Sequence, residues 1–146
     1  MHSSFSMRVL AVDPGSKNIG LAISDPTGTI ANPLMVIPHI RRVEDAARIA
    51  AIAAQYEVER IVVGQSLDED GEPTLQGRQA RKLANTIAAH TRVPVVLWNE
   101  YGSTQTARRA YIQMGVKRRE RRGHLDAIAA TVILQSYLDS TSDLHT

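Results

Sequence analysis

The chain begins with short apolar runs, and segments with apolar residues at helical spacing follow them. Three runs come first, at 7–12, 18–24 and 29–37, and only brief turns such as Asp13-Pro14-Gly15-Ser16 separate them. Connections this short favour antiparallel strands, because parallel strands need a long crossover. Pro33 interrupts the third run, which is typical of an edge strand or a bulge.

The remaining pattern alternates helices with strands. Apolar residues recur at helical spacing over 43–56, and the segment ERIVVG at 59–64 predicts a buried strand. Thr74 is a suitable N-cap for a helix to about residue 90. Further elements are predicted as a strand at 93–98, a helix at 103–114, a basic loop at 117–123 and a helix at 125–138. This order predicts an α/β fold with a mixed five-stranded sheet (three antiparallel strands, then two parallel) flanked by helices.

Length and composition are those of one globular domain. The chain has 146 residues, of which 43% are hydrophobic and 22% charged, and we expect a single domain over 7–139 with disordered tails at 1–6 and 140–146. Met7 is a candidate biological start. The absence of Cys excludes disulfides, thiolate nucleophiles and zinc fingers. Since no apolar run is long enough for a membrane span and no signal peptide is evident, we expect a cytoplasmic protein with no membrane contact.

Positive charge is concentrated in one segment. Residues 108–122 hold seven Arg or Lys against a single Glu, whereas the formal net charge of the whole chain is only +2. Such a segment favours a polyanionic partner, although a solvated helix end and loop would have the same composition. Aromatic residues make up only 4% of the chain, so base stacking is not expected to dominate.

Three acids lie at positions where a carboxylate is unfavourable. Asp13 ends the first strand, Glu100 follows the 93–98 strand, and Asp126 lies in the first turn of the last helix. If the first and fifth strands are parallel, both strand ends reach one edge of the sheet, and a helix packed across the sheet can bring Asp126 there. Converging carboxylates repel one another unless a cation neutralises them, and oxygen ligands favour Mg²⁺ or Mn²⁺. Two such ions about 3.5–4 Å apart can promote phosphodiester cleavage.

Each acid also has a simpler explanation. Asp13 precedes Pro14-Gly15 and suits a turn. Asp126 near a helix start interacts favourably with the helix dipole. Glu100 is explained equally well as an exposed residue.

Four motifs in order resemble those of one protein family. They are DPGSKNIGLAISD at 13–25, IVVG at 61–64 followed by Asp70-Gly71, VPVVLWNEYGST at 93–104, and LDAIAA at 125–130 followed by ILQ at 133–135. The chain from 7 to about 139 thereby resembles the YqgF (RuvX) family, whose members are RNase H-like proteins described as Holliday junction resolvases and as pre-16S rRNA nucleases.

The resemblance implies an RNase H-like sheet with Asp13, Glu100 and Asp126 as catalytic residues and metal ligands, and Mg²⁺ or Mn²⁺ as cofactor at a two-metal site. Three positions depart from the family pattern. Asn18 stands where an Arg is expected, Asn99 replaces an Asp, and Tyr101 replaces an Arg. We expect these changes to alter substrate binding or the charge around the metal.

Other residues are candidates for supporting roles. The nucleic-acid contacts are expected from Lys17, Lys117, Arg118, Arg119, Arg121 and Arg122. The accessory candidates are Gly15, Ser24, Asp25, Ser103, Thr104 and His124. Asp25 is explained equally well by turn chemistry, Ser103 by helix capping, and His124 either by proton transfer or by an incidental position.

Three functions remain open at this point. The first is a metal-dependent endonuclease acting on an rRNA precursor or on branched DNA, as a monomer or, for a junction, as a homodimer. The second is a non-catalytic nucleic-acid-binding or regulatory protein that keeps the fold. The third is an ATP-binding phosphotransferase of the actin and sugar-kinase type, which shares a D-x-G motif but needs two such domains and therefore a longer chain.

Overall fold

The computed structural model describes residues 7–99 and 118–144 and contains one mixed sheet. Its strands are β1 (Val9–Pro14), β2 (Asn18–Ser24), β3 (Ala31–Pro38), β4 (Arg60–Gln65) and β5 (Val95–Asn99). They lie in the order β3-β2-β1-β4-β5. The first three strands pair antiparallel, while β4 is parallel to both β1 and β5. The predicted α/β fold with three antiparallel and two parallel strands is confirmed.

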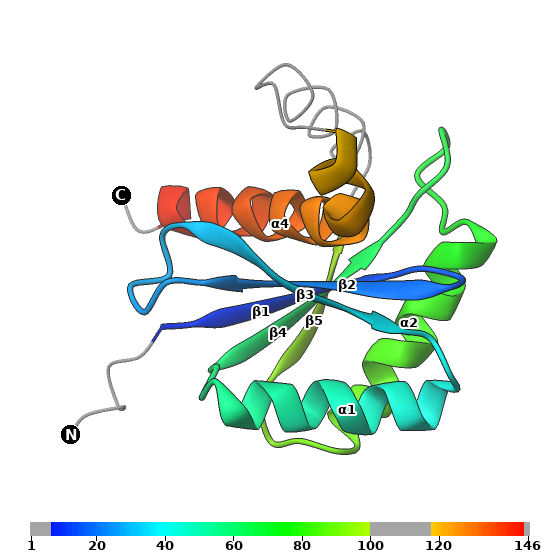
Figure 1. Cartoon of the computed structure of the whole chain (residues 1–146), viewed down its shortest axis with the longest axis horizontal. Coiled ribbons are helices and arrows are strands. Elements are labelled where there is room, and N and C mark those ends of the chain that lie inside the picture. The colour runs from blue at the N-terminus through cyan, green and yellow to red at the C-terminus, as the bar shows by residue number, and fades with distance from the viewer. Residues whose placement is uncertain (1–6, 100–117, 145–146) are drawn as a thin grey trace.

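Helices cover both faces of this sheet. The described helices are α1 (Arg42–Gln55), α2 (Leu75–Ala88) and α4 (Arg118–Leu144). Figure 1 shows α4 lying across one face, whereas α1 and α2 lie on the other. Thr74 caps α2 as predicted, because its hydroxyl accepts a hydrogen bond from the Gly77 N–H at 3.0 Å.

Two predictions about the last helix are wrong. The helix begins at Arg118, so residues 118–123 are helical rather than a basic loop, and it continues to Leu144, so the expected disordered tail from 140 is helical over most of its length. Arg and Glu are good helix formers, and no proline interrupts the segment. The helix predicted at 103–114 and the tail at 1–6 lie outside the described residues.

The third strand has the irregularity that its proline predicts. Leu21 pairs with Met35 whereas Ala22 pairs with Pro33, so one extra residue, Leu34, bulges from β3. Since β3 is at the edge of the sheet, the missing N–H of Pro33 is tolerated there.

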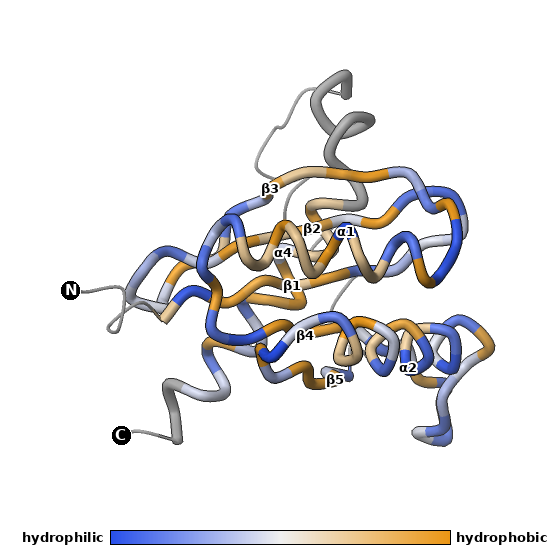
Figure 2. The backbone as a smooth tube through the Cα atoms, turned by 90° about the horizontal axis from the view of Figure 1, so that it is seen from below, coloured by the Kyte–Doolittle hydropathy of each residue, from blue (hydrophilic) through white to orange (hydrophobic). Residues whose placement is uncertain are grey.

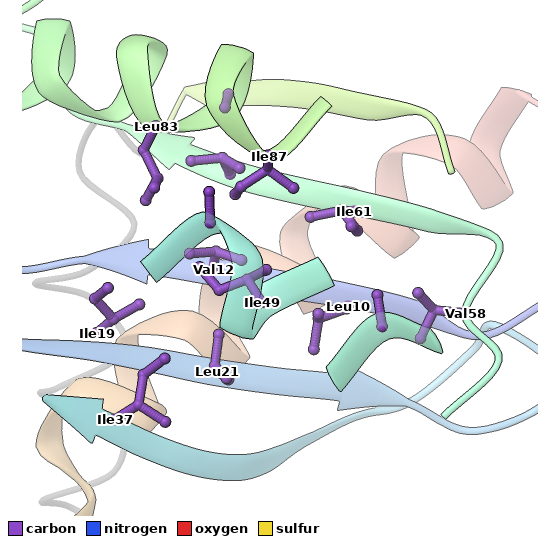
Figure 3. Packing of buried hydrophobic residues seen from close by; sticks show 14 of the residues in the cluster. Leu10, Val12, Ile19, Leu21, Ile37, Ile49, Val58, Ile61, Leu83 and Ile87 are labelled. Carbon is purple, nitrogen blue, oxygen red and sulfur yellow. The ribbon is translucent and has the colours of Figure 1, made fainter. Parts of the chain in front are cut away.

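Alternating side chains of the sheet divide the core into two layers. Leu10 and Val12 of β1 pack with α1 and α2 (Figure 3), whereas Val9 and Ala11 pack with α4. Figure 2 shows hydrophobic residues running along β1 and β4, while hydrophobic and hydrophilic positions alternate along α1 and α2. Burial on both faces explains why β1 and β4 read as continuous apolar runs.

Side-chain contacts fix α4 to both edges of the sheet. At β5, the Trp98 ring meets Tyr137 edge to face at 5.4 Å, and its Nε1 donates to Ser136 at 3.2 Å. At β3, the Gln135 amide accepts from the Ala31 N–H at 2.9 Å and donates to the Thr29 carbonyl at 3.0 Å. The position of α4 over the sheet is therefore specified by directional contacts as well as by apolar packing.

Truncating Leu134 in α4 should destabilise the fold strongly. Its side chain is fully buried between α4 and the sheet, so Leu134→Ala should lower the free energy of unfolding by about 3 kcal/mol. Val132→Ala, at a half-buried position of the same helix, should cost less than about 1.5 kcal/mol. Urea unfolding followed by circular dichroism measures both. Equal losses in the two variants would contradict this account of α4 docking.

Candidate active site

Three parallel strands end at one edge of the sheet. Val12 of β1 lies opposite Val63 of β4, and Gln65 of β4 lies opposite Asn99 of β5. We call this the carboxyl edge, defined by Asp13, Pro14, Gln65 and Asn99. The first and fifth strands are parallel, with β4 between them.

Asp13 lies at the carboxyl edge on the face that α4 covers. Side chains alternate along a strand, so Asp13 shares the face of Val9 and Ala11, which pack with α4. Its partner in β2 is Gly20, which has no side chain to cover it. The residue is half-buried. This is the one predicted catalytic acid whose side chain belongs to the described part of the chain.

The direction of α4 places residue 126 toward the same edge. The later part of the helix lies near the start of β1, because Tyr137 and Leu138 line one pocket together with Val9. Ala130, earlier in the helix, belongs to the same buried cluster as Ala11. Asp126 lies one turn before Ala130, about 6 Å further along the helix. Asp13 lies a comparable distance beyond Ala11, about 7 Å along β1.

The turn after Asp13 requires a glycine. A Cβ atom on Gly15 would lie 2.3 Å from the carbonyl oxygen of Asn18, closer than any non-bonded pair tolerates. Lys17, in the same turn, is exposed, and its carbonyl accepts a hydrogen bond from the His39 N–H at 2.9 Å. The turn is therefore held tightly against the end of β3.

Ser24 and Asp25 lie at the opposite end of the sheet from Asp13. The Ser24 hydroxyl accepts from the Val9 N–H, at the start of β1. The Asp25 carboxylate accepts from the N–H groups of Ile30 at 2.9 Å and Thr29 at 2.8 Å, and from the Thr27 hydroxyl. These hydrogen bonds hold the pKa of Asp25 well below its usual range, and the one from the Ile30 N–H contributes most. The structure does not bring these two accessory candidates near Asp13: both residues shape a turn.

The other candidates fall outside what the structure describes. Glu100, Ser103, Thr104 and Lys117 lie beyond the described residues. Arg118, Arg119, Arg121, Arg122 and His124 lie in α4, but their side chains, like that of Asp126, are not among those described. Within residues 7–99 and the described side chains of α4, no group of three or more His, Asp or Glu forms a metal-binding cluster.

The carboxyl edge also contains polar residues that the sequence did not single out. Gln65 is 4% exposed, and its Nε2 has no hydrogen-bond partner. Asp45, 1% exposed in the first turn of α1, lies 2.5 Å from Nδ1 of His39 and accepts from the Ile40 N–H at 3.0 Å. The signal for both was a polar residue within an otherwise buried pattern, and such groups are costly unless they bond.

Comparison with known proteins gives consistent matches over nearly the whole chain. The family model described as "RuvX: Holliday junction resolvase" matches residues 7–140. A protein of Anaeromyxobacter sp. is 44% identical over 91% of this chain and 97% of its own length, and one of Caldanaerobacter subterraneus is 42% identical over 92% and 97%. Both are named "Putative pre-16S rRNA nuclease".

Solved structures share the fold at low sequence identity. The Fowlpox virus resolvase in complex with Holliday junction DNA aligns with a TM-score of 0.60 at 14% identity, covering 92% of this chain and 99% of that one. Thermus thermophilus RuvC in complex with a Holliday junction substrate aligns at 0.57 and 17%, covering 92% and 96%. Among the described residues, no helix is long and apolar enough to span a membrane.

The carboxylate of Asp25 should make stability depend on pH. Its lowered pKa means that the folded state binds the proton more weakly than the unfolded chain does. Asp25 therefore stabilises the fold above the ordinary carboxyl pKa of about 3.9, and this contribution is lost as the pH falls below that value. Asp25→Asn should lower the free energy of unfolding at pH 7, and the difference from wild type should shrink from about pH 4 downward.

Urea unfolding at a series of pH values measures this difference. The matched control is Asp70→Asn, at an exposed loop position, which should match wild type at every pH. A wild-type advantage over Asp25→Asn that stays constant between pH 7 and about pH 2 would count against the turn assignment.

Proposed function

The chain belongs to the RuvX family, and we propose on this basis that it is a metal-dependent endonuclease that hydrolyses phosphodiester bonds in structured nucleic acid. The observation that carries the metal-site proposal is the position of Asp13. Its carboxylate is half-buried at the carboxyl edge, on the face toward which the start of α4 runs. Ligands of open α/β sheets bind at this edge.

Asp13, Glu100 and Asp126 are proposed as the catalytic residues and metal ligands. Glu100 is the next residue after β5, and Asp126 lies one turn before the buried Ala130 of α4. A set of carboxylate oxygens suits Mg²⁺ or Mn²⁺, and three converging carboxylates need a cation to remain ionised together. When bound, such cations would activate water and stabilise the leaving oxygen. We propose that the role of the chain is to bring these three acids together around the cation.

Precursor RNA is the favoured substrate. Relatives that share 42–44% identity with this chain over nearly their full lengths are named for pre-16S rRNA, so we propose the 5′-end processing of such a precursor. Branched DNA is the second candidate, because the family description names Holliday junctions. Symmetric cleavage of a junction needs two active sites and therefore a homodimer, whereas precursor cleavage needs only one chain.

Basic residues at the start of α4 are proposed to contact phosphates. Positions 118 and 122 precede Asp126 by two turns and one turn of the same helix. The basic segment therefore continues directly into the element that carries the third acid. Lys117, Arg119 and Arg121, together with the exposed Lys17 in the turn after Asp13, are proposed to complete this surface.

Replacing Asp13 should abolish cleavage without unfolding the protein. Metal assistance contributes several kcal/mol to such reactions, so Asp13→Asn should lower the cleavage rate more than about 100-fold. The assay presents a precursor rRNA fragment, a single strand and a four-way junction, each with and without Mn²⁺. Asp139→Asn, the same substitution at an exposed position of α4, should cleave as wild type does.

The outcomes separate the proposed function from its alternatives. Cleavage that persists in Asp13→Asn would show that Asp13 is not catalytic. Binding of all three probes by the wild type without any cleavage would favour a non-catalytic regulatory protein. Cleavage of the precursor alone would select the RNA function over the junction function.

A further inference from the structure

A cleft opens at the carboxyl edge, on the face of the sheet opposite α4. Its volume is about 430 Å³, within the range of small-ligand sites. The turn after β1, the end of β3, the start of α1 and one side of α2 enclose it. The lining residues are Pro14, Gly15, Ser16, Ile19, His39, Arg41, Arg42, Asp45, Gln79 and Leu83.

This cleft adjoins Asp13 through the backbone. Pro14 and Gly15, the two residues that follow Asp13, form part of its wall. Gly15 approaches the Asn18 carbonyl closely and adds no side chain to the wall of the cleft at this point. The cleft and Asp13 thus lie on the two sides of the same turn.

Exposed positive charge lines the cleft. Arg41 and Arg42 are both exposed, and neither has an ion-pair partner among the described residues. The one acid in the lining, Asp45, is already engaged by His39 and by the Ile40 N–H. Its carboxylate is therefore buried and bonded, while the two guanidinium groups remain available.

Folding stability does not explain these two arginines. They stand at the N-cap and the first residue of α1, where no side chain caps the helix. A cation at this end is repelled by the helix dipole, so neutral residues would serve the fold at least as well. The fold therefore gives no reason for two cations at this position.

We propose that this cleft binds a phosphodiester group of the substrate strand, next to the phosphate that reacts at Asp13. The strand then crosses the carboxyl edge, held on one face by the basic start of α4 and on the other by Arg41 and Arg42. Arginine suits this role because its planar fork binds phosphate oxygens in pairs. The inference rests on the proposed function, since it places the same substrate on a second surface.

The test measures RNA binding in a variant that should not cleave the RNA. In the Asp13→Asn background, a fluorescein-labelled RNA hairpin with a single-stranded flank is titrated by anisotropy at a series of KCl concentrations. Arg41→Gln/Arg42→Gln is compared with Arg81→Gln/Lys82→Gln, which removes the same charge from exposed positions of α2 that do not line the cleft.

Loss of the cleft contacts should reduce the salt dependence of binding. Each neutralised phosphate contributes about 0.7 to the slope of log K against log salt on a single strand, and the two arginines share one phosphodiester group, so their loss should lower the slope by about 0.7. The Arg81/Lys82 pair should leave the slope unchanged. The melting temperature of the Arg41/Arg42 variant should equal or exceed that of its parent, because two cations leave the helix start.

Three results would overturn the inference. They are equal slopes in the two double variants, a melting temperature that falls in the Arg41/Arg42 variant, and no binding of the hairpin by the parent. A wild type that binds but never cleaves would refute the nuclease proposal, whereas the slope comparison would still decide the role of the cleft.

Discussion

Parallel pairing of β1, β4 and β5 is the constraint on which the whole candidate site depends. Backbone hydrogen bonding aligns Asp13, Gln65 and Asn99 at one edge although they are far apart along the chain. Parallel strands require covering layers on both faces. Because α1 and α2 supply one layer and α4 the other, the edge lies between two helical surfaces of different character (Figure 1).

The two helical layers offer different chemistry to a polyanion that reaches this edge. On one side, α4 is anchored by Trp98 and Gln135 and begins in a basic segment. On the other side, α1 begins with Arg41 and Arg42 above a cleft that shares a wall with the turn after Asp13. A strand bound by both would be held on each side of the reacting phosphate, and such positioning contributes much of enzymatic rate enhancement.

Much of the fold was predictable from hydrophobic patterning alone. The five strands, α1, α2 and the Thr74 cap follow from local periodicity and capping chemistry, which tertiary structure left in place. The basic segment at 118–123 is helical although its charge is also typical of a loop, because Arg and Glu are good helix formers. The location of Asp13 at the carboxyl end of β1 was predictable, because the apolar run before it predicts a buried strand and Pro14-Gly15 ends that strand.

Features that depend on contacts between distant segments could not be predicted. Ser24 and Asp25 belong to the same sequence motif as Asp13, at 13–25. The antiparallel pairing of β1 and β2 nevertheless places them at the opposite end of the sheet. The cleft beside Arg41 forms only when the end of β3 meets the turn after β1. No local pattern encodes that meeting.

Paramagnetic broadening of backbone amide signals by Mn²⁺ tests the central claim most directly. If a carboxylate site forms at the carboxyl edge, substoichiometric Mn²⁺ should broaden the signals of Asp13, Gly15 and Gln65 first. The signals of Asp25 and Thr29, at the far end of the sheet, should remain sharp, and Asp13→Asn should remove the effect. Broadening centred on the acidic loop at 68–72, or equal broadening at both ends of the sheet, would contradict the account.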